Sequence, residues 1–117
     1  MNGSDLLVLF FTLQNQLRLL HWQTDSFARH KAYGEAYDTL GDLFDDFVEA
    51  YQGKNERLAL DSGEHSVPIK NIDSAELNSL FDSAISALEG DIGGFLTDRD
   101  TDLMNIRDEI VGALNKL

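Results

Sequence analysis

Four side chains in the first half of the sequence belong to types that bind transition metals. His21 and His30 are two of the three histidines, and Asp45 and Glu49 stand four positions apart, which is one helical turn. The sequence contains no cysteine, so a metal would be held by imidazole and carboxylate groups, which suit iron, zinc or manganese. On a straight helix, Asp45 would lie about 22 Å from His30 along the axis, at a rise of ~1.5 Å per residue. One chain therefore cannot bring all four to one metal, whereas two chains packed antiparallel about a two-fold axis can.

This set differs from that of an ordinary di-iron helix bundle. Such bundles use a Glu-x-x-His pair on each of two helices, and no such pair occurs in this sequence. Trp22 follows His21 directly and is predicted to be an aromatic of the core or of a chain interface, with a place beside the metal as the alternative. The third histidine, His65, is predicted to be an ordinary loop residue.

The spacing of apolar residues predicts four helices. In the first, Leu6, Phe10 and Leu13 begin a stripe in which steps of four and three alternate, as on one face of a helix. The second helix has an aromatic stripe from Tyr33 to Tyr51, which is expected to pack in the core, with a seam between chains as the alternative. Beside it runs an acidic stripe formed by Asp38, Asp42, Asp45 and Glu49. The helices are expected at about residues 4–21, 27–52, 74–90 or 96, and 98–117.

A long connection is predicted between the second and third helices. Residues 53–73 contain Gly63, Pro68 and scattered polar residues, and about 20 residues is too many for a tight turn in a compact bundle. Gly53 is the predicted stop of the second helix, and residues 55–60 are predicted to form a short helix. A long crossover in a four-helix unit is typical of ferritin-like bundles.

Acidic residues are expected to mark the starts of the last two helices. Asp73 and Glu76 have the spacing of a capping box. Asp98, Asp100 and Asp102 are expected to place negative charge at the start of the fourth helix, where the helix dipole favours it. The lining of an ion pore between subunits is the alternative for these three aspartates.

Composition limits the classes of function. The 117 residues suffice for one domain, 1–117, and they carry a net charge of −12, which would repel a phosphate backbone. We therefore expect no nucleic-acid binding, although an acidic mimic of nucleic acid is a remote alternative. The longest apolar run, Leu6 to Leu13, is far short of the ~20 residues that cross a bilayer. No membrane partner and a cytoplasmic location are therefore expected.

The candidate ligands resemble those of a known family, the Dps proteins, which are ferritin-like protectants that store iron in cages. The resemblance rests on His21-Trp22, Phe27, His30 and the Asp-x-x-x-Glu pair, whose members follow His30 by fifteen and nineteen positions, as in that family. Segment 101–116 also resembles the family's last helix. Segment 105–110 resembles short ferritin-like chains from phages, which suggests a phage origin.

The resemblance implies an all-α, ferritin-like antiparallel four-helix bundle with one long crossover between the second and third helices. It also implies a homodimer, or a larger homo-oligomeric cage, that binds iron at the dimer interface through His21 and His30 of one chain and Asp45 and Glu49 of the other. If an open coordination position remains, Fe(II) oxidation and storage would follow, as a ferroxidase-type oxidoreductase activity.

The sequence departs from the family pattern at two places. Gly34 stands where the family has an aspartate, four residues after His30, and Asp38 or Glu35 are the potential substitute ligands. The turn between His21 and His30 is also shorter than in the family. The alternative expectation is therefore a metal-free ferritin-like structural or interaction module whose site has been eroded.

Overall fold

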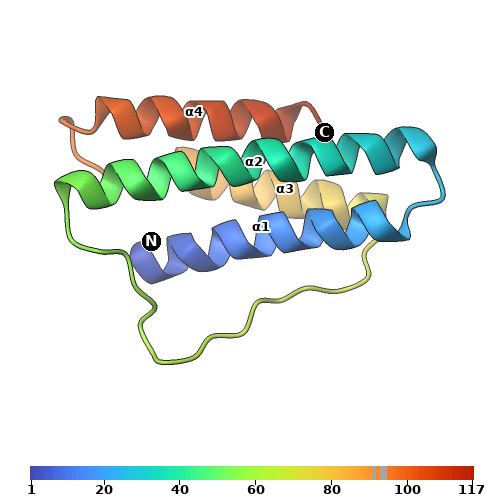
Figure 1. Ribbon diagram of the computed structural model, residues 1–117, viewed down its shortest axis with the longest axis horizontal. Helices are drawn as coiled ribbons and strands as arrows, with labels where there is room; N and C mark the ends of the chain where they lie inside the picture. The colour runs from blue at the N-terminus through green and yellow to red at the C-terminus, as the bar shows by residue number, and fades with distance from the viewer. Residues whose placement is uncertain (91, 93–94) are drawn as a thin grey trace.

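The computed structural model describes residues 1–90, 92 and 95–117, and this part of the chain is built from α-helices without β-strands. The four helices are α1 (Gly3–Gln23), α2 (Phe27–Lys54), α3 (Ser74–Glu89) and α4 (Thr101–Asn115). Their axes run side by side, with α1 and α2 toward the viewer, α3 behind them and α4 along the far edge of α2 (Figure 1). The predicted all-α fold with four helices is confirmed.

The core is made by the apolar stripes that the sequence pattern predicts. Phe10 of α1 stacks on Phe44 of α2 with ring centroids 4.1 Å apart, and Phe47 meets Phe10 edge-on at 5.7 Å. Leu88 and Ile110 extend the same buried cluster into α3 and α4. Each such side chain contributes roughly 1.5–3 kcal/mol by leaving water, so this cluster fixes how the helices pack.

Side-chain caps explain where three of the helices begin. At α1, Asn2 and Asp5 form a reciprocal capping box, and at α2 the hydroxyl of Ser26 accepts a hydrogen bond from the Arg29 amide. At α3, the Asp73 carboxylate accepts the amide of Glu76 at 2.8 Å. The predicted start of the third helix is confirmed. The helix begins there because the cap satisfies an amide that has no partner within the helix.

Several predicted boundaries were wrong. Helix α2 continues through Gly53 to Lys54, and no described glycine adopts a positive φ, so Gly53 is not a left-handed stop. Residues 55–60 form no helix. Helix α3 ends at Glu89, close to the shorter of its two predicted ends; the longer alternative falls partly on residues 91, 93 and 94, which lie outside the described residues.

Helix α4 begins at Thr101 rather than at residue 98, and it ends at Asn115 rather than at 117. The reason for the late start is the carboxylate of Asp100, which accepts hydrogen bonds from the amide and hydroxyl of Thr97. The Asp100 carboxylate is thus bonded to Thr97, in the turn before α4, and makes no capping hydrogen bond to an amide of α4. Only Asp102 lies in the first helical turn, so the expected helix-dipole role applies to it and not to Asp98.

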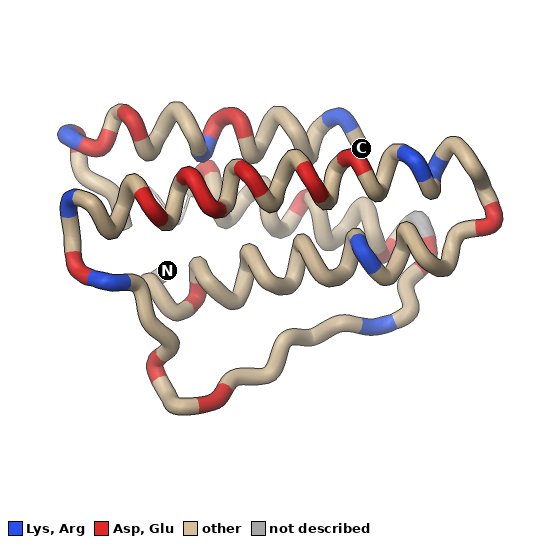
Figure 2. Tube along the Cα trace, in the orientation of Figure 1, with Lys and Arg blue, Asp and Glu red and all other residues tan. Residues whose placement is uncertain are grey.

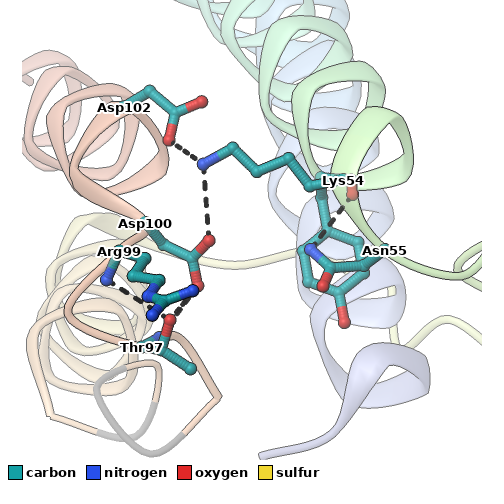
Figure 3. A network of polar contacts seen from close by, with 7 residues as sticks. Lys54, Asn55, Thr97, Arg99, Asp100 and Asp102 are labelled. Atoms are coloured by element: carbon teal, nitrogen blue, oxygen red, sulfur yellow. Dashed lines mark hydrogen bonds and ion pairs between the residues drawn. The ribbon is translucent and has the colours of Figure 1, made fainter.

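Lys54 links the end of α2 to the start of α4 (Figure 3). Its amino group lies 3.5 Å from a carboxylate oxygen of Asp100 and also donates to Asp102. The bond to Asp102 raises the pKa of Lys54. Bonds from Thr97 lower the pKa of Asp100, and the bond from Lys54 lowers the pKa of Asp102. All three groups are thereby held in their charged forms.

The crossover, residues 55–73, is fastened to α1 by polar side chains and runs along the side of α1 away from α2 (Figure 1). Buried Gln16 donates to the Lys70 carbonyl at 2.8 Å and accepts the Lys70 amide at 3.3 Å. Buried Ser4 accepts the amide of Asp61 at 3.0 Å. These buried polar groups therefore hold the connection against α1.

No helix among the described residues is long and apolar enough to cross a membrane. His65 lies exposed in the crossover, outside any helix, as predicted for an ordinary loop residue.

Candidate functional site

The three-residue link between α1 and α2 brings His21 and His30 together. Their rings stack face to face, with centroids 3.8 Å apart and an angle of 18° between the ring planes. His21 is half-buried and His30 is exposed. The short turn therefore pairs the two histidines instead of separating them.

Each histidine is held by the backbone of the other. Nδ1 of His21 lies 2.6 Å from the carbonyl oxygen of His30, and Nδ1 of His30 lies 2.7 Å from the carbonyl oxygen of His21. A carbonyl oxygen only accepts hydrogen bonds, so each Nδ1 must carry the hydrogen and donate it. In the neutral rings both Nε2 atoms then keep a free lone pair, which is the arrangement in which a backbone carbonyl orients a metal-binding histidine.

Gly34 makes room for this pair. A Cβ atom at position 34 would lie 3.0 Å from Nδ1 and 2.9 Å from Cε1 of His21, and the second distance is shorter than real Cβ atoms show. The His21 ring thus lies directly against the backbone of α2. The resemblance places an aspartate at position 34. The glycine found there allows the His21 ring to take this position, which a larger residue would block.

The two proposed substitutes for that aspartate lie on different sides of α2. Asp38 lines a cavity of about 230 Å³ together with His21 and Gly34. Glu35 instead lines a groove between α2 and α4, where Glu109 also lies. Of the two, only Asp38 shares a cavity with His21.

Asp45 and Glu49 are both exposed on α2. The part of the chain that the structure describes contains no group of three or more His, Cys, Asp or Glu side chains that could hold a metal ion. One chain thus pairs His21 with His30 and leaves the two carboxylates apart from them. A four-ligand site would require a second chain.

Charge is distributed unevenly along α2 (Figure 2). Basic residues lie at its start, acidic residues follow through its middle, and Lys54 lies at its end. The acidic residues are Glu35, Asp38, Asp42, Asp45, Asp46 and Glu49. An antiparallel pair of such helices would set the basic start of one against the acidic stretch of the other.

Trp22 is 66 % exposed, so the prediction that it packs in the core of the chain was wrong; the alternatives of an interface or a place beside a metal stay predictions. Its indole is covered on one side by Arg18, whose guanidinium carbon lies 5.4 Å from the ring centroid. The same guanidinium lies 4.9 Å over Tyr37 and donates to its hydroxyl at 2.9 Å. All three side chains line the cavity beside His21.

Sequence reasoning missed Arg18. Its spacing of four residues from Trp22 on one helix was a usable signal, since such pairs share a helix face. The contact with Tyr37 is formed only when α1 packs on α2, and no local pattern indicates it.

Two further exposed aromatics lie on these helices, Phe27 at 80 % and Phe11 at 47 % exposure.

The sequence pattern described as "Family of unknown function (DUF5856)" matches residues 21–117. The chain belongs to this family. The matched range of the DUF5856 chain begins at His21 and includes His30, Asp45 and Glu49.

A relative of the DUF5856 chain comes from Enterobacteria phage T4 and is named "Uncharacterized 14.6 kDa protein in mobD-ri intergenic region". The two are 40 % identical over 55 residues, which are 47 % of this chain and 43 % of the relative. The match thus spans less than half of the phage protein's length. No solved structure matches the chain significantly.

Proposed function

We propose that this protein is a Dps-like metal-binding protein whose four helices form a ferritin-like bundle and whose homodimer binds iron. In this proposal His21 and His30 of one chain and Asp45 and Glu49 of the other hold each ion. Asp38, which shares a cavity with His21, is the reserve carboxylate. Zinc or manganese would fit the same donors, because such sites select metals by geometry and availability.

The observation that carries the proposal is the reciprocal hydrogen bonding of His21 and His30. It uses both Nδ1 atoms and leaves both Nε2 atoms as lone-pair donors on a ring pair that is already ordered. The two Nε2 donors therefore lie on neighbouring rings before an ion binds. The stacked rings would have to turn relative to each other to direct both lone pairs at one ion.

The carboxylates support the proposal through charge. Two carboxylates from α2 would neutralise a divalent cation that the two imidazoles bind without adding charge. A net charge of −12 also raises the concentration of cations near the surface. The acidic stripe would thus both attract the ion and complete its coordination.

The experiment is a titration of the metal-free protein with Fe(II) in the absence of oxygen, in which calorimetry measures the heat of binding. We expect one iron per chain in the wild type and loss of binding in His21→Ala and in Glu49→Ala. His65→Ala removes a histidine that lies in the crossover and should bind like the wild type. A wild-type protein that takes up no Fe(II), Zn(II) or Mn(II) would refute the proposal.

Oxidation of the bound iron is the catalytic part of the proposal. With hydrogen peroxide as the oxidant, two Fe(II) ions each give up one electron, and one peroxide with two protons becomes two waters. Stopped-flow absorbance of Fe(III) would follow this step. Binding without faster oxidation than free Fe(II) would leave a metal-binding protein and remove the ferroxidase assignment.

A metal-free ferritin-like interaction module is the second candidate, and the contact between Gly34 and His21 favours it. A glycine stands where the resemblance places a carboxylate, and both Nδ1 atoms are already bonded to backbone carbonyl oxygens. This candidate predicts that the protein dimerises equally well with and without a chelator. The titration with Fe(II) separates the two candidates.

A further inference from the structure

Arg18 is a cation that aromatic side chains hold, and it forms no ion pair within the described part of the chain. The chain has 21 acidic and 9 basic residues, yet among the described residues Arg18 forms no ion pair, whereas Lys54, Lys70 and Arg107 do. Its guanidinium is held instead by Tyr37 and Trp22. The guanidinium therefore contacts aromatic rings and not a carboxylate, although Asp38 of the same chain lines the same cavity.

The surroundings of Arg18 have the character of an interface between chains. Trp22 and Phe11 lie on the same face of α1 as Arg18, at spacings of four and seven residues, and both are exposed. Exposed aromatics beside an ordered arginine are the residue types that anchor protein interfaces. Phe27 adds an exposed aromatic on the face of α2 that carries Asp38.

The proposed metal site fixes the register of a second copy. If the histidine end of one chain meets Asp45 and Glu49 of the other across a two-fold axis, that axis passes α2 near residue 38, midway between the two ligand groups. Arg18 contacts Tyr37 and so lies close to that axis. It would then face the middle of the other α2, where the exposed carboxylates are Asp38 and Asp42.

We propose that Arg18 recognises a second copy of this chain by binding the carboxylates of Asp38 and Asp42 on its α2. This inference rests on the proposed function for its register. Near the axis the two chains would otherwise bring four like charges together, which is unfavourable. The two Arg18 side chains place positive charge among them, and the prior contact with Tyr37 and Trp22 lowers the entropy lost on docking.

The test is the monomer–dimer equilibrium in a chelator, measured by analytical ultracentrifugation. Arg18→Glu should weaken the wild-type dimer about 100-fold, from about tenfold at each of the two symmetry-related contacts. Arg57→Glu is the matched control, because it makes the same charge change at an exposed residue of the crossover, outside the helices. That control should leave the dimer unchanged.

A charge swap gives the second measurement. Asp42→Arg alone should also weaken the dimer, since each variant brings like charges together when it pairs with itself. A mixture of Arg18→Glu with Asp42→Arg should form a heterodimer, because both contacts across the axis are then complementary. Asp42 is chosen because Asp38 also lines the Arg18 cavity of its own chain.

Each outcome decides the inference. A monomeric wild type, an Arg18→Glu dimer as strong as the wild type, or a mixture that forms no heterodimer would overturn it. The dimer is measured in a chelator, whereas the proposed metal site is tested by the Fe(II) titration, so failure of one can be told from failure of the other. A wild type that binds no iron but depends on Arg18 for dimerisation would refute only the metal site.

Discussion

Replacing Gly34 by alanine tests the coupling between this glycine and the histidine pair. The added methyl group would lie 2.9 Å from Cε1 and 3.0 Å from Nδ1 of His21, so the ring has to move. Moving the ring breaks the two reciprocal hydrogen bonds with His30. At roughly 0.5–1.5 kcal/mol each, their loss costs about 1–3 kcal/mol of unfolding free energy.

The same substitution brings a gain that a control can isolate. Alanine is favoured over glycine inside a helix by about 1 kcal/mol, so Gly34→Ala should be between neutral and about 2 kcal/mol less stable than the wild type. Gly112→Ala in α4 meets no atom within 4 Å and should keep the full gain of about 1 kcal/mol.

Urea denaturation followed by circular dichroism measures both variants, and the NMR signals of the imidazole nitrogens report the two Nδ1–H groups directly. We expect Gly34→Ala to lie at least about 1 kcal/mol below Gly112→Ala and to lose the Nδ1–H pattern of His21. Equal stabilisation of the two variants, with unchanged imidazole signals, would refute the coupling.

Three further predictions concern the fold. Phe47→Ala should cost about 3–5 kcal/mol of unfolding free energy, because Phe47 is fully buried against Phe10. The control Phe27→Ala changes a side chain that is 80 % exposed and should change the unfolding free energy by less than about 0.5 kcal/mol in the same urea titration. Equal losses in the two variants would contradict the described core. Gln16→Leu should cost about 1–3 kcal/mol, because it leaves both backbone groups of Lys70 without their partner; limited proteolysis should cut the crossover faster, and an unchanged rate would show that Gln16 does not hold it. Asp100 and Asp102 have lowered pKa values, so the stability they contribute is present above their ordinary value of 3.8 and is lost as the pH falls below it. Lys54→Met should reduce this acid-dependent loss in thermal melts at a series of pH values, and an unchanged profile would show that the ion pairs contribute nothing.

The helices could be predicted because their signals are local. The steps of four and three between apolar residues predicted the buried faces, and Phe44 and Phe47 lie where the aromatic stripe placed them. The cap at Asp73 was predicted from two residues three positions apart. Each of these signals lies within one or two helical turns, where sequence spacing determines which residues meet.

The errors at the helix ends involve both neighbouring and distant residues. Helix α4 starts late because Asp100 bonds to Thr97 and to Lys54, which is far away in sequence. Gly53 matched the pattern of a helix stop, but helix α2 continues past it to Lys54 and is capped at Asn55. Trp22 was expected in the core or at an interface, and its exposure excludes the core of the chain, since the core stripe of α1 passes on the opposite side.

The candidate site was predictable in part. Sequence spacing placed His21 and His30 on either side of a turn and showed that one chain separates them from Asp45 and Glu49. The stacking of the rings, the role of Gly34 and the ordering of Arg18 depend on how closely α1 approaches α2. Those three features follow only from the packed structure.

The central claim, a metal site shared between two chains, is tested most directly by complementation. His30→Ala and Glu49→Ala each remove one side of every site, so each variant alone should bind no iron. In a mixed dimer one of the two sites receives intact residues from both chains, so an equal mixture should recover about a quarter of the wild-type iron if chains pair at random. Recovery at that level is the result that we predict. A mixture that binds as little iron as the separate variants, while mass spectrometry shows that mixed dimers have formed, would contradict the shared site.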